Sequence, residues 1–498
     1  MSASSVKQGV VFPEYDGSVS TTTTGKLIWQ AAVGSLDEAL VDGLKSEKDF
    51  RHQYPKYLCR LADLGAVSTE NALAIARGGL DAVASAFAFI NSNGERLALD
   101  QAMSSPSKTA PLYSGIITGE AKVASSLQFP PNQGRDDGLE LLKELAAFGT
   151  CEPDVATSAS AIAEMDSTKL QKLLSQHVFV LLGGTSEMGP YLPLVKLGAT
   201  VVVVARREKK LAALIKGARS TAAGTIVVPT SRAITTKDND EVLAEVAGAD
   251  VLTQAPEIAA WLAGLYPDRT MVIGSYIYLD GEAHIRAVVA MDAILTAVTK
   301  ARPTGLTGAM YLGSPATAHN ISKSAWEDSK QRYESQPWYS AIWATPLSFK
   351  VNARPLVGET AVTNGMLVFQ GPNYALAKTI QLWRAILMQA DGALVSLNMA
   401  PPCRTYSVVH SAQAKAAIEG MANFAPNRAF DPEFASAVMA ALMLFDLTPA
   451  GRKVAKALKN PNDITIGNGF HGGNVRCAYL TDSLGPAAYV TGLLGFTA

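Results

Sequence analysis

The sequence predicts an α/β protein built on a doubly wound parallel sheet, with a mostly helical region ahead of it. From His177 onward, short runs rich in Val, Ile and Leu alternate with segments of helical periodicity, which is the pattern of β-α-β units. These runs are largely apolar along their length, as expected of strands that helices cover on both faces. A glycine-bearing turn directly follows the first run, where this architecture joins its first strand to its first helix.

The individual elements follow from these runs and from the turn residues between them. Gly, Pro, Asn and Asp separate the apolar segments and set their ends. The expected strands are 177–182, 200–205, 225–229, 250–253, 270–274, 307–312 and 393–398. The expected helices between them include 190–197, 208–216, 240–247, 282–300 and 374–389.

Residues 1–170 are expected to form a mostly helical N-terminal domain ahead of an α/β domain at 171–498. Ser35 to Glu38 has the form of a capping box before an amphipathic run. Three possible roles remain open for this region: a capping domain, a dimerisation element or a dock for a carrier protein. The further helices are expected at 68–89, 138–148 and 166–175, and the proline-containing stretch 104–136 is expected to be a loop.

Composition excludes several classes of protein. The 498 residues are 48% hydrophobic and 17% charged, which excludes a disordered chain. Lys and Arg total 43 against 44 for Asp and Glu, so no basic excess indicates nucleic acid binding. We find no run of about 18 uncharged apolar residues and no secretory or transit pattern, so we expect a soluble cytoplasmic protein without a membrane span.

Motifs for several common chemistries are missing from the sequence. The four cysteines lie far apart without a CxxC pair, and the histidines show no HExxH or HxH grouping, so no disulfide framework and no metal site are expected. The GxSxG elbow of hydrolases and the GxxxxGK[ST] loop of nucleoside triphosphatases are also missing.

The first strand opens the stretch VFVLLGGTSEMGPYLPLVKLGATVVVVARR, which contains a strand, a glycine-bearing turn, a helix and a second strand. In dinucleotide-binding proteins such a turn lets the backbone approach a pyrophosphate at the helix N-terminus. The alternative is a tight strand-to-helix turn without a ligand. The residues expected to contact the cofactor here are Gly183, Gly184, Thr185, Ser186 and Gly189.

Two arginines end the second strand, where a dinucleotide site places the residue that reads the ribose. An acidic side chain there would bind the two ribose hydroxyls, whereas arginine suits a 2′-phosphate. We therefore expect NADP(H) rather than NAD(H), bound by Arg206 and Arg207. The alternative for Arg206 is a solvated charge at the start of the next helix.

The glycine turn and the strand after it resemble the nucleotide-binding start of the short-chain dehydrogenase/reductase superfamily, a family with a Rossmann-like fold. Gly183 and Gly189 match the outer glycines of the family's TGxxxGxG turn. Leu182 replaces its Thr, and Glu187 replaces its middle Gly. The glutamate places a carboxylate beside the expected pyrophosphate, which is repulsive unless the side chain turns away.

The resemblance continues to about residue 405. Ala255 is the one match to the family's Asn-Asn-Ala-Gly turn. In APPCRT, Pro401 matches the family's Pro-Gly turn, Pro402 stands where Gly is usual, and Thr405 arrives one residue early. The resemblance implies that Ala255, Pro401 and Thr405 contact the cofactor.

Tyr374 and Lys378 have the YxxxK spacing of the same family. At i and i+4 on a helix, both side chains lie on one face. We expect the lysine ammonium to lower the pKa of the phenol towards neutrality and to bind the nicotinamide ribose. The tyrosine would then give its proton to a carbonyl oxygen as hydride arrives at the carbon.

The resemblance also implies a serine that orients the substrate oxygen. Ser314 is the expected residue, with Ser275 as the second choice, and each is alternatively an ordinary strand-end hydroxyl. The family's fourth helper, an Asn in the helix before this strand, has no clear counterpart in HIRAVVAMDAILTAV.

Ser314 is far from Tyr374 in sequence, which predicts an insertion at about 315–365. This insertion would form a lid, a partner surface or a plain aromatic core. His319 and Lys323 within it are expected to be a surface helix pair, and the glycine-rich tail around His471 is expected to be a structural loop. The aromatic residues of the insertion are Trp326, Tyr333, Trp338, Tyr339 and Trp343.

The leading hypothesis is an NADP(H)-dependent oxidoreductase that reduces a ketone or enone of a small apolar substrate, with Tyr374, Lys378 and Ser314 as catalytic residues. The first alternative is a catalytically inactive nucleotide-binding scaffold or regulatory subunit of a larger assembly. The second is a dehydratase or epimerase that holds its cofactor tightly. A homo-oligomer is expected, with a multi-enzyme partner as a further option.

Overall fold

A mostly parallel sheet forms the centre of the molecule. The computed structural model describes residues 7–105, 111–235, 237–336, 349–352 and 354–495. The strands of this sheet are β6 (Tyr113–Thr118), β7 (His177–Leu182), β8 (Thr200–Val204), β9 (Thr225–Thr230), β10 (Thr270–Ser275), β11 (Thr307–Gly313) and β15 (Leu394–Met399). Their order is β15-β11-β10-β7-β8-β9-β6; β6 pairs antiparallel with β9, and all other neighbours are parallel.

The order of the parallel strands places a reversal of the chain between β7 and β10. Counted along the chain, these strands are arranged third, second, first, fourth, fifth and sixth, as in dinucleotide-binding sheets. In open sheets of this kind, ligands bind outside the carboxyl ends of the strands at the reversal. The predicted α/β fold with a largely parallel sheet is confirmed. A ligand site is therefore expected at the residues after β7 and β10.

Helices cover both faces of this sheet. All six residues of β7 are buried, with Val178, Val180 and Leu182 in one hydrophobic core and Phe179 and Leu181 in the other. The first core includes α12 (Ala255–Ala263), α13 (Glu282–Ala301) and α16 (Gly371–Ala390). The second includes α6 (Gly138–Phe148), α7 (Pro153–Ala163), α8 (Ser167–Gln176), α9 (Tyr191–Lys196), α10 (Lys209–Thr221), α11 (Asp240–Val246) and α19 (Pro432–Leu447).

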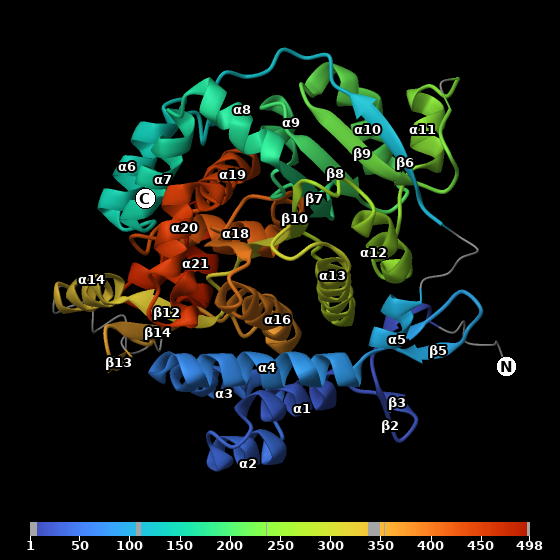
Figure 1. Ribbon diagram of the computed structural model, residues 1–498. Helices are drawn as coiled ribbons and strands as arrows, with labels where there is room; N and C mark the ends of the chain where they lie inside the picture. The colour runs from blue at the N-terminus through green and yellow to red at the C-terminus, as the bar shows by residue number, and fades with distance from the viewer. Residues whose placement is uncertain (1–6, 106–110, 236, 337–348, 353, 496–498) are drawn as a thin grey trace.

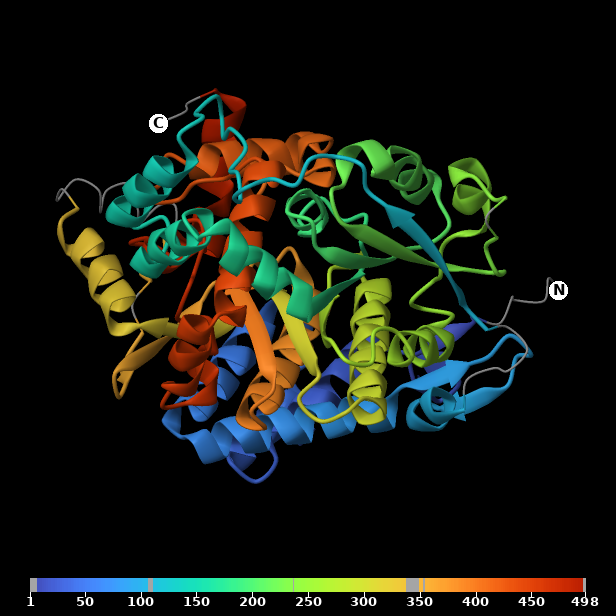
Figure 2. The same ribbon diagram turned by 45° about the horizontal axis from the view of Figure 1, so that its top comes forward.

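The N-terminal helices extend the first of these cores. In Figures 1 and 2 they lie beside α16, and the Trp29 ring meets Trp383 of α16 edge-on at 5.4 Å between centroids. The first helices are α1 (Thr21–Val33), α2 (Glu38–Ser46), α3 (Phe50–Val67), α4 (Thr69–Ala86) and α5 (Leu99–Ser104). Short strands accompany them: β1 (Gly9–Val11), β4 (Ala88–Ile90) and β5 (Arg96–Ala98) form one sheet, and β2 (Glu14–Tyr15) pairs with β3 (Ser18–Val19).

Three local expectations are wrong. The stretch 104–136 is not only a loop, because β6 within it joins the main sheet, with alternate residues buried next to β9. The expected strand 250–253 is a turn, in which the Asp250 carboxylate accepts from the backbone N–H of Leu252 at 2.8 Å. Asp37, and not Ser35, caps α2 by accepting from the N–H of Leu40.

In its described residues, 315–336, 349–352 and 354–365, the insertion contains a small antiparallel sheet and one helix. The order is β12-β14-β13, formed by β12 (Ala318–Ser322), β13 (Leu356–Val357) and β14 (Thr360–Asn364), with α14 (Lys323–Glu334) after β12. His319 is a buried residue of β12, so the expected surface helix pair is wrong. Trp326 is partly buried and donates to the carbonyl of Arg354, whereas Trp338, Tyr339 and Trp343 lie outside the described residues.

The C-terminal region packs over the same end of the sheet as the insertion (Figure 1). Its elements are α17 (Tyr406–Val409), α18 (Ala412–Met421), α20 (Pro449–Lys456), η1 (Pro461–Thr465), η2 (Asn474–Arg476) and α21 (Thr481–Leu493). Helices α18 and α21 pack backbone to backbone, because a Cβ on Gly420 would lie 1.8 Å from the carbonyl oxygen of Ala488.

One bent pair of helices has the length and composition of a membrane span. Within the described ranges, no single helix is long and apolar enough to cross a membrane. Helices α19 and α20 pass only when taken together, and they are bent by 78° where they meet.

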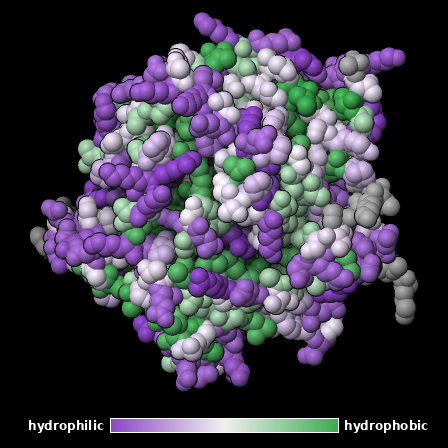
Figure 3. Space-filling view, in the orientation of Figure 1, coloured by the Kyte–Doolittle hydropathy of each residue, from purple (hydrophilic) through white to green (hydrophobic). Residues whose placement is uncertain are grey.

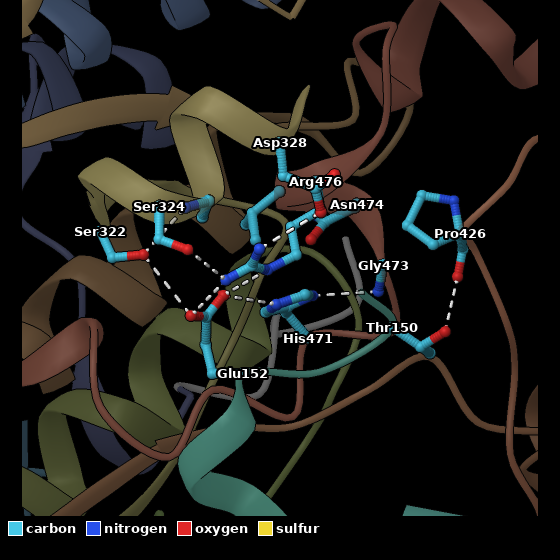
Figure 4. Close-up of polar contacts among 12 residues, drawn as sticks. Thr150, Glu152, Ser322, Ser324, Asp328, Pro426, His471, Gly473, Asn474 and Arg476 are labelled. Atoms are coloured by element: carbon cyan, nitrogen blue, oxygen red, sulfur yellow. Dashed lines mark hydrogen bonds and ion pairs between the residues drawn. The ribbon is translucent and has the colours of Figure 1, made fainter. Parts of the chain in front are cut away.

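A buried ion cluster fixes the C-terminal segment against the insertion (Figure 4). Both carboxylate oxygens of Glu152 accept from the Arg476 guanidinium, at 2.9 and 2.8 Å, and His471 contacts the same carboxylate at 3.2 Å. Arg476 also pairs with Asp328 of α14 at 3.2 Å. From this fixed segment the Asn474 side chain donates to the carbonyl of Pro315 at 3.0 Å. The expected structural role of the glycine-rich tail agrees with these contacts.

We expect Glu152→Gln to lower the free energy of unfolding by about 3 kcal/mol, because it leaves the Arg476 guanidinium buried without its main counter-charge. Thermal melting of the full chain measures this effect. The matched control is Glu120→Gln, which removes a 72% exposed carboxylate 4.0 Å from Arg219 and should change stability by less than about 1 kcal/mol.

The same variant has a defined pH dependence. Burial raises the pKa of Glu152, but the hydrogen bonds and charges of His471 and Arg476 outweigh it and hold the pKa at about 2, below the ordinary 4.5. The ionised carboxylate therefore stabilises the fold above about pH 4.5, and this stabilisation is lost as the pH falls towards 2. The melting temperatures of wild type and Glu152→Gln should converge over that range, and a constant gap would contradict the assignment.

Candidate functional site

The candidate site lies at the carboxyl edge of the sheet, around the reversal between β7 and β10. Gly183 follows β7, Tyr276 follows β10, Ser314 follows β11 and Ala400 follows β15. Helices α13 and α16 line the same edge from the first face. Figure 3 shows apolar residues gathered towards the middle of this face of the molecule, with more hydrophilic residues around the rim.

The fold brings Ser314 and Tyr374 into direct contact. The Tyr374 phenol, in the first turn of α16, donates to Ser314 Oγ at 2.8 Å although the two residues are 60 positions apart. The backbone N–H of Ala316 donates to the same oxygen at 3.2 Å, which fixes its position. Ser275, the second choice from the sequence, ends β10 and is buried, but Tyr374 donates its hydrogen bond to Ser314.

Lys378 lies one helical turn after Tyr374. Its ammonium donates to the carbonyl of Leu312 at 3.2 Å and to the side-chain oxygen of Gln381 at 3.3 Å. Leu312 belongs to β11, so the lysine connects α16 to the strand that leads to Ser314. The three side chains expected from the sequence to act together are therefore grouped on one helix and the adjacent strand end.

Burial controls the ionisation of this group. It raises the pKa of Tyr374 to about 12, against a smaller lowering by the Ser314 hydrogen bond. Desolvation lowers the pKa of Lys378 to about 8. The expected shift of the phenol towards neutrality is therefore wrong for the protein without ligands, because desolvation dominates and the ammonium is directed at Leu312 and Gln381. Tyr374 keeps its proton at neutral pH.

His284 is a residue of this site that the sequence reasoning missed. It lies in the first turn of α13, is 2% exposed and stacks against Tyr374 with 5.8 Å between ring centroids and 19° between planes. Tyr278, 57% exposed, meets both rings edge-on or tilted. The available signal was a histidine near the start of the helix in which the family's Asn had been sought.

The glycine turn closes tightly on its own backbone. Gly183 has φ +94°, and a Cβ there would lie 2.8 Å from the backbone nitrogen of Ile277. The N–H of Ser186 donates to the carbonyl of Gly183, and the N–H of Gly189 donates to that of Ser186. The Ser436 hydroxyl of α19 donates to the carbonyl of Gly189 at 2.8 Å and braces the turn from the second face.

The helix after this turn is shorter than expected. Helix α9 has six residues, begins only at Tyr191 and carries Pro193 in its first turn, where no N–H is available. The expected source of free N–H groups and positive helix charge beside Thr185 and Ser186 is therefore weak. Both prolines, Pro190 and Pro193, were visible in the sequence, and they account for the short helix.

Glu187 turns its carboxylate away from the turn backbone and towards α17. It accepts from the backbone N–H of Tyr406 at 2.9 Å. Thr405 is the N-cap residue of α17, so this contact joins the glycine turn to the turn after β15 that contains Pro401. The glutamate that departs from the family pattern therefore has a structural role, because its hydrogen bond joins the two turns.

The two arginines after β8 differ in how far hydrogen bonds to other residues engage their side chains. Arg207 donates to Ser231 Oγ at 3.1 Å and to the carbonyl of Val246 at 3.2 Å. Arg206 is 56% exposed and contacts Glu208 at 3.1 Å. Arg206 therefore remains accessible to a 2′-phosphate, whereas Arg207 is engaged in holding the loops after β9 and α11.

Ala255 does not lie at the site edge. It is fully buried at the start of α12, after a turn and not after a sheet strand. The fourth strand in order is β10, so the position assigned to Ala255 belongs to residues after Ser275. The stretch before Ala255 packs against β1, where the N–H of Val10 donates to the carbonyl of Leu252, and the role of Ala255 as a cofactor contact stays a prediction.

A cavity of about 790 Å³ runs along the outer side of the glycine turn. The space beside Ser314 and Lys378 is far smaller, at about 20 Å³. The large cavity therefore does not coincide with the hydrogen-bonded group, and we place the chemistry at the latter because the convergent polar side chains are there. The cavity lies between the turn, α9, α10, the start of α19 and residues 124–130. Among the described residues, no three His, Cys, Asp or Glu side chains are grouped to hold a metal ion.

Comparison of the chain with protein-family models, with curated proteins and with solved structures found no match. The assignment of a function therefore depends on the geometry of Ser314, Tyr374, Lys378 and the residues around them.

Proposed function

We propose that the protein is an NADP(H)-dependent oxidoreductase of the short-chain dehydrogenase/reductase type that reduces a ketone or enone of an apolar substrate. The observation that carries the proposal is the 2.8 Å hydrogen bond from Tyr374 to Ser314, with Lys378 one turn along the same helix. A strand-end serine, a tyrosine and a lysine at the carboxyl edge of a dinucleotide-type sheet form an arrangement suited to protonating a carbonyl oxygen.

The residues of the chain fit the cofactor in their donor chemistry. Arg206 is exposed where the 2′-phosphate of NADP(H) would lie, and the charge of Glu187 is directed at Tyr406. Gly183 and Gly184 leave the turn without side chains beside the strand end. NADP(H), when bound, supplies the hydride that reaches the carbonyl carbon. Arg206 would hold its phosphate, and Lys378 its nicotinamide ribose.

The side chains of the chain account for the proton. Ser314 Oγ and the Tyr374 phenol lie 2.8 Å apart, and when a carbonyl oxygen binds beside them each can turn its single O–H from their mutual hydrogen bond to that oxygen and hold it in place. The phenol, with its pKa of about 12, carries the proton that the oxygen takes up. Lys378, with a pKa of about 8, is mainly protonated at neutral pH, and its charge stabilises the phenolate that remains.

The glycine turn after β7 favours a second candidate function. A nucleotide-binding scaffold or regulatory subunit without catalysis would tolerate the short α9 and the Glu187 contact to Tyr406, because such a protein does not need an open diphosphate site. Turnover separates the two candidates, because a scaffold could bind NADPH but would not oxidise it with a ketone. Assembly as a homo-oligomer and a cytoplasmic location remain proposals.

We expect NADPH to bind with micromolar affinity and NADH to bind much more weakly, because Arg206 pairs with the 2′-phosphate. Arg206→Ala should weaken NADPH binding by about tenfold and leave NADH binding unchanged. Isothermal titration calorimetry measures both. Arg232→Ala, which removes a 46% exposed arginine paired with Asp238, is the control and should have no effect.

We expect Glu187→Gly to raise the affinity for NADPH by about tenfold, because it removes a negative charge next to the diphosphate. Glu187→Gln keeps an oxygen acceptor for the N–H of Tyr406 and loses only the charge, so it isolates the electrostatic part. Equal affinities for wild type, Glu187→Gln and Glu187→Gly would place the diphosphate elsewhere.

We expect Tyr374→Phe to reduce carbonyl reduction by at least about a hundredfold and to leave NADPH affinity nearly unchanged, because the proton donor is lost and the ring stays. Oxidation of NADPH with a panel of apolar ketones measures the rate, and calorimetry measures the affinity. Tyr278→Phe is the matched control on the exposed side of the same aromatic cluster. Retained turnover in Tyr374→Phe removes the tyrosine from the mechanism.

A further inference from the structure

His284 presents a buried hydrogen-bonding atom with no partner beside the proposed proton donor. Its ring stacks on Tyr374, and its Nε2 atom is inaccessible to solvent and lacks any hydrogen-bond partner. A buried polar atom without a partner costs free energy and therefore requires an explanation. Nothing in the proposed reaction uses this atom.

The local hydrogen bonds decide which nitrogen carries the proton. The backbone N–H of Leu279 points at Nδ1 across a long 3.5 Å contact, so Nδ1 is the acceptor. The proton of the neutral ring is then on Nε2. Burial and, after it, the charge of Lys378 lower the pKa of His284 to about 3. The ring stays neutral at physiological pH, and Nε2–H is a donor and not a base.

A further hydrogen-bond donor and an exposed aromatic ring surround this atom. Lys378 donates through two long contacts, so its ammonium retains a third N–H near the same site. Tyr278 stands 5.0 Å from the His284 ring and 6.2 Å from the Tyr374 ring, and its exposed side faces the solvent edge of the cluster. Hydrogen-bond donors that lack acceptors therefore lie close together here. Such a site suits a ligand whose oxygen atoms can accept hydrogen bonds.

We propose that His284 binds the ligand directly, donating Nε2–H to a hydroxyl or carbonyl oxygen held next to Tyr374. This inference rests on the proposed function and adds a residue to it. The oxygen belongs either to a ribose hydroxyl of NADP(H) or to the carbonyl of the substrate. A neutral imidazole in this position polarises the oxygen without competing with Tyr374 for its proton.

Two substitutions separate the donor from the packing. His284→Phe keeps an aromatic ring against Tyr374 and removes the N–H, whereas His284→Gln keeps an N–H donor and removes the ring. His52→Phe is the control, because His52 has a 65% exposed side chain on α3. Melting temperatures within a few degrees of wild type for His284→Phe establish that the variant folds.

Nitrogen-15 labelling of histidine in the full chain tests the ionisation and tautomer directly. We expect one ring, missing in His284→Phe, to show a proton on Nε2 and no titration between pH 5 and about 9. This readout needs no ligand. A ring that titrates near its ordinary pKa, or that carries its proton on Nδ1, overturns the proposal.

Binding measurements identify the source of the oxygen. With NADP+ alone, a loss of about tenfold in affinity for His284→Phe, partly restored in His284→Gln, assigns the acceptor to the ribose. Unchanged NADP+ affinity with a raised KM for cyclohexanone assigns it to the substrate carbonyl. If neither value changes while wild type binds and reacts, the inference fails and the proposed function stands. If wild type binds no NADP+, the proposed function fails first, and the ligand assigned to His284 is withdrawn with it.

Discussion

The structure depends on covering both faces of the central strands. β7 is buried along its whole length, so each face needs an apolar layer, and alternate residues supply two separate cores. This constraint explains why the N-terminal helices pack on α16 and why the C-terminal helix α19 returns to the opposite face. Helices α16 and α13, which carry Tyr374 and His284, are packed between the sheet and the N-terminal elements on the first face.

The rigid layers give the candidate site its electrostatic character. Tyr374, Lys378 and His284 lie among apolar side chains, so desolvation is the largest influence on the pKa of each. The result is a protonated phenol, a lysine ready to lose its proton just above neutrality and a neutral imidazole. Each group is held in the form that donates a hydrogen bond, which suits the binding of an oxygen and the delivery of one proton to it.

The sequence predicted the secondary structure best where a buried element is a continuous apolar run of neighbouring residues. Strands such as β7 and β11 are continuous apolar runs, and their expected bounds agree with the structure to within a residue. β6 was missed because prolines before and after it resemble a loop, and its pairing with β9 is a long-range contact. The stretch 250–253 has strand-like residues, but the Asp250 side chain folds it into a turn.

The candidate site was only partly predictable for the same reason. The spacing of Tyr374 and Lys378 is local and readable, whereas the contact to Ser314 spans an insertion and rests on the analogy alone. His284 left no local signal, because α13 carries other polar residues as well and the ring contact to Tyr374 comes from a distant part of the sequence. Two departures from the family pattern, Glu187 and the short α9, lie at the glycine turn. The group proposed to transfer the proton keeps a desolvated lysine and an unpartnered imidazole. Apolar side chains would stabilise these positions, so their cost in stability is best explained by chemistry that needs them.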